Sequence, residues 1–213
     1  MKKSNKTLVI TTAVCLLPII LSIAVYSRLP EEVAVHFNGS GSADGFLPKA
    51  LAAFGLPVAF ALINFISVFM RNNDPKAANA SAAIKTFLNW LLPFMSVVII
   101  PVTLFMAMGA DIPLHMIIPA AAAVIIIVCG NYLPKSKQNY TVGIKLPWTL
   151  QSETNWNKTH RFAGYLWVAG GIVLIAASFF EIGVIIDIAV FGVLIVLPII
   201  YSYFAYRNEK ASA

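Results

Sequence analysis

The sequence predicts an all-α integral membrane protein with six transmembrane helices, and three observations lead to this prediction. Of the 213 residues, 59% are hydrophobic and 11% are charged, and the mean hydropathy is +0.82, whereas soluble domains carry about 25% charged residues. The apolar residues form unbroken runs of 19 to 25 residues, and a helix needs about 20 residues to cross a bilayer core. Unbroken runs also disfavour a β-barrel, whose strands alternate apolar and polar residues.

Six charge-free runs define the expected spans, which cover residues 7–27, 50–70, 86–110, 112–134, 162–180 and 188–206. The first run follows a basic N-terminus and therefore also resembles a signal peptide. It is longer than the usual apolar region of such peptides, and no small-residue cleavage site precedes Arg28. We therefore expect it to be retained as the first span. Prolines inside the spans are expected to kink them; they are Pro18, Pro57, Pro93, Pro101, Pro119 and Pro198.

The basic residues predict the orientation. With six spans both termini lie on one face, and the segments expected on that face hold thirteen of the fifteen Lys and Arg residues, while Arg28 and Lys49 lie on the other. This asymmetry follows the positive-inside rule, so we expect both termini in the cytoplasm. It also explains the net charge of +6 through contact with the lipid bilayer, without nucleic acid as a direct partner.

Each half of the chain contains one long loop. We expect an N-terminal three-span unit, 1–110, with an outer loop at 29–49, and a C-terminal three-span unit, 111–213, with an inner loop at 133–161. Both loops begin and end near Leu-Pro pairs, which fits the inverted repeat of many transporters. Leu and Pro are frequent in this chain, so chance explains the match easily.

The outer loop is expected to form a small hairpin. Residues 32–37 alternate weakly, and the dipeptides Asn38-Gly39 and Asp44-Gly45 are typical of tight turns, with Phe46 packing at the membrane interface. His36 and Asp44 supply two ligands for a metal, and His115 could add a third, but no pair has the fixed spacing of a metal site. Turns held by Asn and Asp side chains are the simpler interpretation.

Catalytic chemistry finds no support in the sequence. The chain contains no Gly-x-Ser-x-Gly, His-Glu-x-x-His or phosphate-loop motif. Cys15 and Cys129 both lie inside apolar runs, which argues against a disulfide or a thiolate metal site. We expect a protein that is not an enzyme, with no catalytic residues, no cofactor and no metal.

The longest polar interruption of the chain, residues 131–161, contains the inner loop. Gly143 suits a turn with positive φ, Pro147 favours an extended Leu146, and Thr149 or Ser152 can cap a short helix. Trp156, His160 and Gly164 fall four residues apart, on one face of a helix. By physics alone this is an interfacial amphipathic segment that leads into span five.

The order of residues in this loop carries more information. It reads Asn131-x-Leu-Pro-Lys135, then Asn139, then Gly143-Ile-Lys145-x-Pro147-Trp148-Thr149-Leu150-x-x-Glu153-x-x-Trp156-x-x-Thr159-His160-Arg161. This string resembles the signature of the SdpI family of bacterial membrane immunity proteins. The outer loop also resembles a domain of unknown function that is often joined to that family. Lys145 departs from the Arg expected at its position; it keeps the charge but not the bidentate geometry of a guanidinium group.

The resemblance implies immunity to a secreted antimicrobial peptide toxin, with capture of a transcriptional repressor at the membrane and hence signal transduction. It implies that an extracellular peptide toxin meets the outer loop at His36, Phe37, Asn38, Gly41, Asp44 and Gly45. It implies that the cytoplasmic repressor meets the inner loop, at Asn131, Pro134, Lys135, Asn139, Gly143, Lys145, Pro147, Trp148, Thr149, Glu153, Trp156, Thr159, His160 and Arg161. A small multi-pass transporter or channel is the alternative function, based on the proline-broken spans and the inverted repeat.

Overall fold

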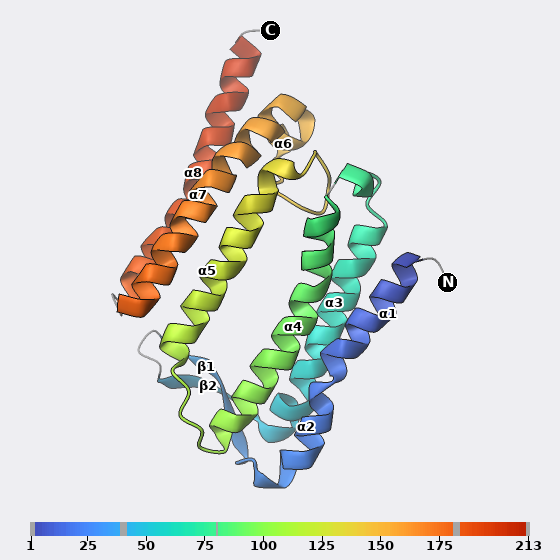
Figure 1. Ribbon diagram of the computed structural model, residues 1–213, viewed down its shortest axis with the longest axis vertical. Helices are drawn as coiled ribbons and strands as arrows, with labels where there is room; N and C mark the ends of the chain where they lie inside the picture. Colours follow the sequence, from blue (N-terminus) through green and yellow to red (C-terminus); the bar gives the residue numbers. More distant parts are fainter. Residues whose placement is uncertain (1–2, 39–41, 80, 181–183, 212–213) are drawn as a thin grey trace. The chain divides into compact units, whose positions relative to one another are not determined.

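The computed structural model describes residues 3–38, 42–79, 81–180 and 184–211 (Figure 1). Six helical segments in this part of the chain are long and apolar enough to span a membrane, which confirms the predicted count. They are Lys6–Arg28, Leu51–Asn72, Ala82–Ala107, Met116–Lys135, Glu153–Phe180 and Ile185–Ala211.

The chain forms two compact units. The first comprises Met1–Asn73 and Lys85–Pro113, and the second comprises Asp74–Ile84 and Leu114–Ala213. Residues 74–84, which we call the connector, link two helices of the first unit but pack with the second.

The first unit contains three spans and a hairpin. Its elements are α1 (Lys3–Leu16), α2 (Pro18–Val25), the 3₁₀ turn η1 (Tyr26–Arg28), β1 (Glu32–Phe37), β2 (Ala43–Pro48), the π-helical turn η2 (Leu51–Gly55), α3 (Leu56–Asn72) and most of α4 (Ala82–Ala107). Its core is made of Val25, Leu29, Ala53, Ile100 and Leu104.

The outer loop folds as the hairpin that the sequence predicts. β1 and β2 pair antiparallel from Glu32 opposite Pro48 to Phe37 opposite Ala43, with an irregularity on either side of His36. At its base the Lys49 ammonium donates to the Glu31 carboxylate over 2.8 Å. The Phe46 side chain is 54% exposed, so contact with this chain does not bury it.

Side chains of neighbouring helices satisfy backbone carbonyls that the prolines leave without a donor. Pro57 has no N–H for the carbonyl of Ala53, and the Ser22 hydroxyl donates to that oxygen over 2.6 Å. At the break before Pro18, the N–H of Leu17 donates to the freed carbonyl of Val14 over 3.1 Å, and the Ser96 hydroxyl donates to the next carbonyl, that of Cys15, over 2.8 Å. An unpaired carbonyl in hydrocarbon costs several kcal/mol, so these hydroxyls allow the kinks.

The second unit contains the other three spans and the inner loop. Its elements are η3 (Ala77–Asn79) in the connector, α5 (Leu114–Tyr132), η4 (Leu133–Lys135), α6 (Pro147–Gln151), α7 (Glu153–Phe180) and α8 (Val184–Ala211). Ala123, Leu174 and Leu194 form its core. α5 and α7 pack closely because Gly164 has no side chain: a Cβ there would lie 2.5 Å from Pro134 Cγ and 2.8 Å from the carbonyl oxygen of Gly130.

Pro198 also leaves a backbone carbonyl of α8 without a helical donor, and the indole N–H of a tryptophan takes the place of that donor. The proline cannot donate to the carbonyl of Leu194 one turn earlier. Nε1 of Trp167 on α7 donates to that oxygen over 2.9 Å. This bond both repairs the kinked helix and fixes α7 against α8.

The helices extend beyond the charge-free runs. α7 begins at Glu153 rather than at the expected residue 162, and α4 begins at Ala82 with Lys85 inside it. A helix continues into water as long as its backbone bonds are kept, whereas the absence of charge marks only the part in lipid. Asn64 and Asn89 link helices: Asn64 Nδ2 donates to Thr11 and Thr12, and Asn89 Oδ1 accepts from Arg71.

Replacing Trp167 by Phe tests the repair of the Pro198 kink. The ring is kept but the Leu194 carbonyl loses its donor, so we expect the free energy of unfolding to fall by about 1–3 kcal/mol. Detergent-based equilibrium unfolding of the purified protein measures it. In a Pro198→Ala background the substituted alanine supplies the missing N–H, and the same replacement of Trp167 should then cost much less.

Trp90→Phe is the matched control, because Trp90 is 45% exposed and its loss should change little. An equal cost of Trp167→Phe with and without Pro198 would contradict the proposed repair.

Candidate functional site

The inner loop is built around Asn139, whose side chain is fully buried. Its Oδ1 accepts the backbone N–H groups of Thr141 at 3.1 Å and Val142 at 2.7 Å. Its Nδ2 donates to the carbonyl of Lys137 at 2.9 Å. One amide side chain therefore supplies the partners that a loop without regular secondary structure lacks.

His160, Trp156 and Gly143 lock this loop onto α7. The rings of Trp156 and His160 stack with centroids 3.9 Å apart, and both side chains are buried. His160 Nε2 accepts the N–H of Ile144 over 2.9 Å, while Nδ1 lies 2.8 Å from the carbonyl of Trp156. Because Nε2 accepts, the proton of a neutral ring is on Nδ1. Gly143 has φ +121°, and a Cβ there would overlap His160 Nε2.

The short helix α6 is closed at both ends by side chains. Leu146 is extended, as the following proline requires, and its N–H donates to the Thr149 hydroxyl over 2.9 Å. At the other end Gln138 Nε2 donates to the carbonyls of Thr149 at 2.9 Å and Leu150 at 2.8 Å. Ser152, one of the two expected caps, begins α7 by accepting the N–H of Asn155.

α8 anchors the same region from its C-terminal half. Trp148 Nε1 donates to the hydroxyl of Ser202 and Asn155 Nδ2 to its carbonyl, each over 2.9 Å. Ser152 donates to the carboxylate of Glu209 over 2.8 Å. Trp148 also packs its ring against Tyr203 and Tyr206. The loop, α7 and α8 are therefore one polar and aromatic assembly.

The connector adds a carboxylate to this assembly. Asp74 is buried, and its oxygens accept from the Thr141 hydroxyl at 2.7 Å, the Lys76 N–H at 2.8 Å and the Tyr140 N–H at 3.1 Å. Burial by itself raises the pKa of Asp74, but the Thr141 hydroxyl and the backbone N–H groups outweigh it and hold the pKa below its ordinary value. Asn79 Nδ2 donates to the carbonyl of Gln138 over 2.7 Å.

The structure divides the predicted inner-loop residues into two groups. Asn139, Thr149, Trp156, Thr159 and His160 are buried and hydrogen-bonded to neighbouring backbone or, for Thr159, to the side chain of Asn155, with Trp148 and Gly143 half-buried beside them. The other seven are exposed, and they are Asn131, Pro134, Lys135, Lys145, Pro147, Glu153 and Arg161. Only the exposed group is available to a partner.

Three residues that hold the site were not singled out from the sequence: Asp74, Gln138 and Ser202. Asp74 lies 67 residues from Thr141 and Ser202 lies 54 from Trp148, so no spacing rule connects them. Of the three, only Ser202 could have been noticed in the sequence, because it is a polar residue inside an apolar run.

The predicted outer site lies on the hairpin. His36 Nδ1 lies 2.5 Å from Asp44 Oδ1, and both side chains are largely exposed. Asn38 Oδ1 accepts the N–H of Ser42 over 3.0 Å, in a turn held by an Asn side chain. Gly45 lies opposite His36, and Phe37 is half-buried.

Gly41 lies outside the described residues, as does the side chain of His115. Among the residues that the structure describes, no three His, Cys, Asp or Glu side chains are placed to hold a metal ion.

The fold defines a multi-pass helical membrane protein with an ordered polar loop between its fourth and fifth spans. Residues 135–202 match the SdpI/YfhL protein family, and residues 13–61 match a domain of unknown function, DUF1648. The chain is 30% identical over 214 residues to "Immunity protein SdpI" of Bacillus subtilis (strain 168), covering 100% of both chains. The chain therefore belongs to the SdpI family, as the loop signature indicated. No solved structure matches it significantly.

Replacing Gly143 by Ala is expected to unfold the inner loop. The positive φ costs about 1–2 kcal/mol for a residue with a side chain, and the overlap with His160 adds to it. Gly109 also has a positive φ, +96°, but a Cβ there meets nothing within 4 Å. Gly109→Ala is thus the control for backbone strain alone. Limited proteolysis of residues 136–146 should accelerate only in Gly143→Ala; similar acceleration in both would contradict this role.

Acid should release the connector from the loop. Because the pKa of Asp74 is lower in the folded than in the unfolded protein, its stabilisation is complete above the unfolded value, about 3.9. It is lost as the pH falls through the folded value. The melting temperature of Asp74→Asn should lie below that of the wild type at pH 7, and the difference should shrink below about pH 4. Asp111→Asn, at an exposed position, should match the wild type throughout; a constant difference for Asp74→Asn would refute the assignment.

Proposed function

We propose that this protein confers immunity to a secreted antimicrobial peptide toxin from within the bacterial cell membrane. The observation that carries the proposal is the full-length similarity to "Immunity protein SdpI", with 100% of each chain covered. The match extends over the outer hairpin and the inner loop alike, so it covers both faces on which a partner would bind.

The hairpin supports binding of a peptide on the outer face. β1 and β2 form a two-stranded sheet, so each strand has one edge without a partner in this sheet. An extended peptide can bind such an edge through its backbone. The exposed side chains of His36, Asn38 and Asp44 flank it with groups that could distinguish one peptide from another.

The inner face would meet a cytoplasmic repressor, with both termini on the same side. The charge distribution supports this orientation. Lys145, Glu153 and Arg161 are exposed, and a rigid loop presents them at low conformational cost. The buried part of the signature would hold these three side chains in place, and toxin binding would signal by changing how they are presented.

Survival under toxin challenge tests immunity. A deletion strain and strains that express the wild type or His36→Ala/Asp44→Ala are exposed to concentrated culture supernatant of the parent strain. We expect the deletion to be killed and depolarised, the wild type to be protected and the double variant to lose most protection at equal membrane abundance. Lys137→Ala, exposed on the inner loop, is the control. Equal survival of the deletion and wild-type strains would refute immunity.

The same strains test the repressor. Arg161→Ala and Lys145→Ala should keep protection but reduce the repressor recovered with the membrane fraction. Trp148→Ala is not suitable, because Trp148 bonds to Ser202 and packs on α8. Unchanged recovery in both variants would exclude this surface as the docking site.

A further inference from the structure

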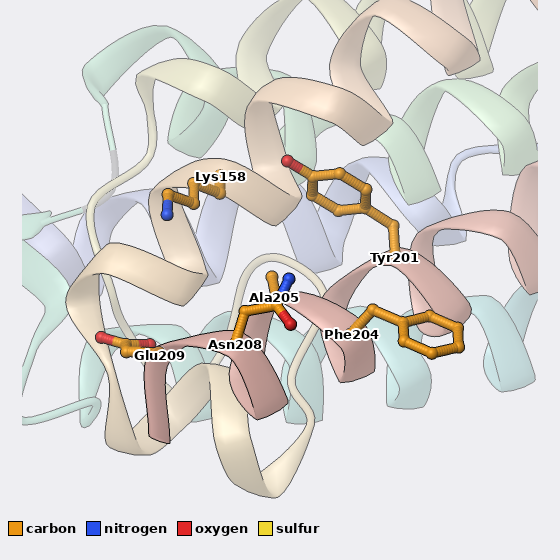
Figure 2. A pocket seen from close by; sticks show the side chains of 6 residues that line it. All are labelled: Lys158, Tyr201, Phe204, Ala205, Asn208 and Glu209. Carbon is orange, nitrogen blue, oxygen red and sulfur yellow. The ribbon is translucent and has the colours of Figure 1, made fainter. Parts of the chain in front are cut away.

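A hollow lies between α7 and α8, near the first turns of α7 and the end of α8. Its volume is about 650 Å³, and it is lined by Lys158, Tyr201, Phe204, Ala205, Asn208 and Glu209 (Figure 2). None of these residues belongs to the loop signature. Figure 2 shows Tyr201 and Phe204 toward one end of the hollow and Glu209 toward the other.

The hollow carries one charge of each sign. In the described part of the chain, the ion pairs join His36 to Asp44 and Lys49 to Glu31, so neither Lys158 nor Glu209 takes part in one. Glu209 accepts a hydrogen bond from Ser152, but a carboxylate has about four acceptor positions. A cationic donor can still bind to it.

The two charges lie at different depths. Glu209 contacts Ser152, the residue before α7 begins, whereas Lys158 lies six residues further along that helix. At 1.5 Å per residue, Lys158 lies about 9 Å along α7 from Ser152, toward the apolar part of that helix. Its flexible side chain can reach part of the way back toward the water.

The aromatic residues place the hollow at the headgroup level of the bilayer. Tyr201 stacks on Phe162 with ring centroids 4.4 Å apart, and Phe204 is 55% exposed. Tyr and Trp gather at this level in membrane proteins, and Tyr203, on the same end of α8, packs against Trp148 of α6. Acyl chains would cover the exposed aromatic rings, and a headgroup would face the charges.

We propose that this hollow binds a phospholipid whose headgroup combines a phosphate with a primary ammonium group, as in phosphatidylethanolamine. The phosphate lies deeper in a bilayer than the ammonium, which is the order of Lys158 and Glu209. Lys158 would bind the phosphate, and Glu209 would accept from the ammonium. Lys158 alone would suit any phospholipid, so Glu209 provides the selectivity.

Lipid binding to the purified full-length protein tests the proposal. Native mass spectrometry is used to titrate it with phosphatidylethanolamine, phosphatidylcholine and phosphatidylglycerol that have identical acyl chains. The wild type should prefer the ethanolamine lipid by roughly threefold, as expected for a partly exposed ion pair. The trimethylated choline group has no N–H for Glu209, and the glycerol group has no cation.

Two variants separate the roles. Glu209→Gln keeps an acceptor for Ser152, and it should remove the preference for ethanolamine while leaving binding of the other two lipids unchanged. Lys158→Gln should weaken all three lipids. Glu153→Gln and Lys137→Gln, exposed positions outside the hollow, should behave as wild type. Equal binding of the three lipids by the wild type, or an unchanged preference in Glu209→Gln, would overturn the proposal.

Discussion

The hydrocarbon core of a bilayer offers no water to a backbone carbonyl, and this constraint governs how the six spans can pack. Pro57 and Pro198 each remove one helical donor. The freed carbonyls of Ala53 and Leu194 accept from Ser22 and Trp167 on neighbouring helices. At these two positions the kink and its hydrogen bond occur together, and without that bond a carbonyl in lipid would be unpaired. Helix packing in each unit follows from these pairs as much as from the apolar surfaces.

The backbone groups of the inner loop also need hydrogen-bond partners, although this loop lies outside the membrane-spanning helices. It has little regular secondary structure, and Asn139, Gln138 and Asp74 supply the partners that a helix or sheet would give to its backbone. The buried members of the loop signature hold the loop together, and a binding surface depends on the seven members that remain exposed.

Much of the fold could be predicted from the sequence because lipid imposes simple patterns. Length and lack of charge located six spans, and turn dipeptides with a β-prone run located the hairpin. The aqueous end of α7 was missed, since charged residues there end the apolar run but not the helix. The docking of Asp74 and the anchor at Ser202 depend on single contacts between segments far apart in the chain, and neither periodicity nor spacing reports such contacts. The candidate site could thus be located from its motif, but its division into buried and exposed residues required the structure.

The connector gives the inner loop a mechanical link to the rest of the chain. Residues 74–84 are covalently continuous with α3 and α4, and Asp74 and Asn79 bond directly to the loop. Gln138 donates a hydrogen bond to a backbone carbonyl of α6, and Ser152 donates one to the carboxylate of Glu209 on α8. Because every step is a hydrogen bond with a buried or half-buried member, the loop cannot shift without leaving a polar group unpaired. Signalling through this loop would therefore require a second arrangement with its own partners, since ligands bias an equilibrium between discrete states.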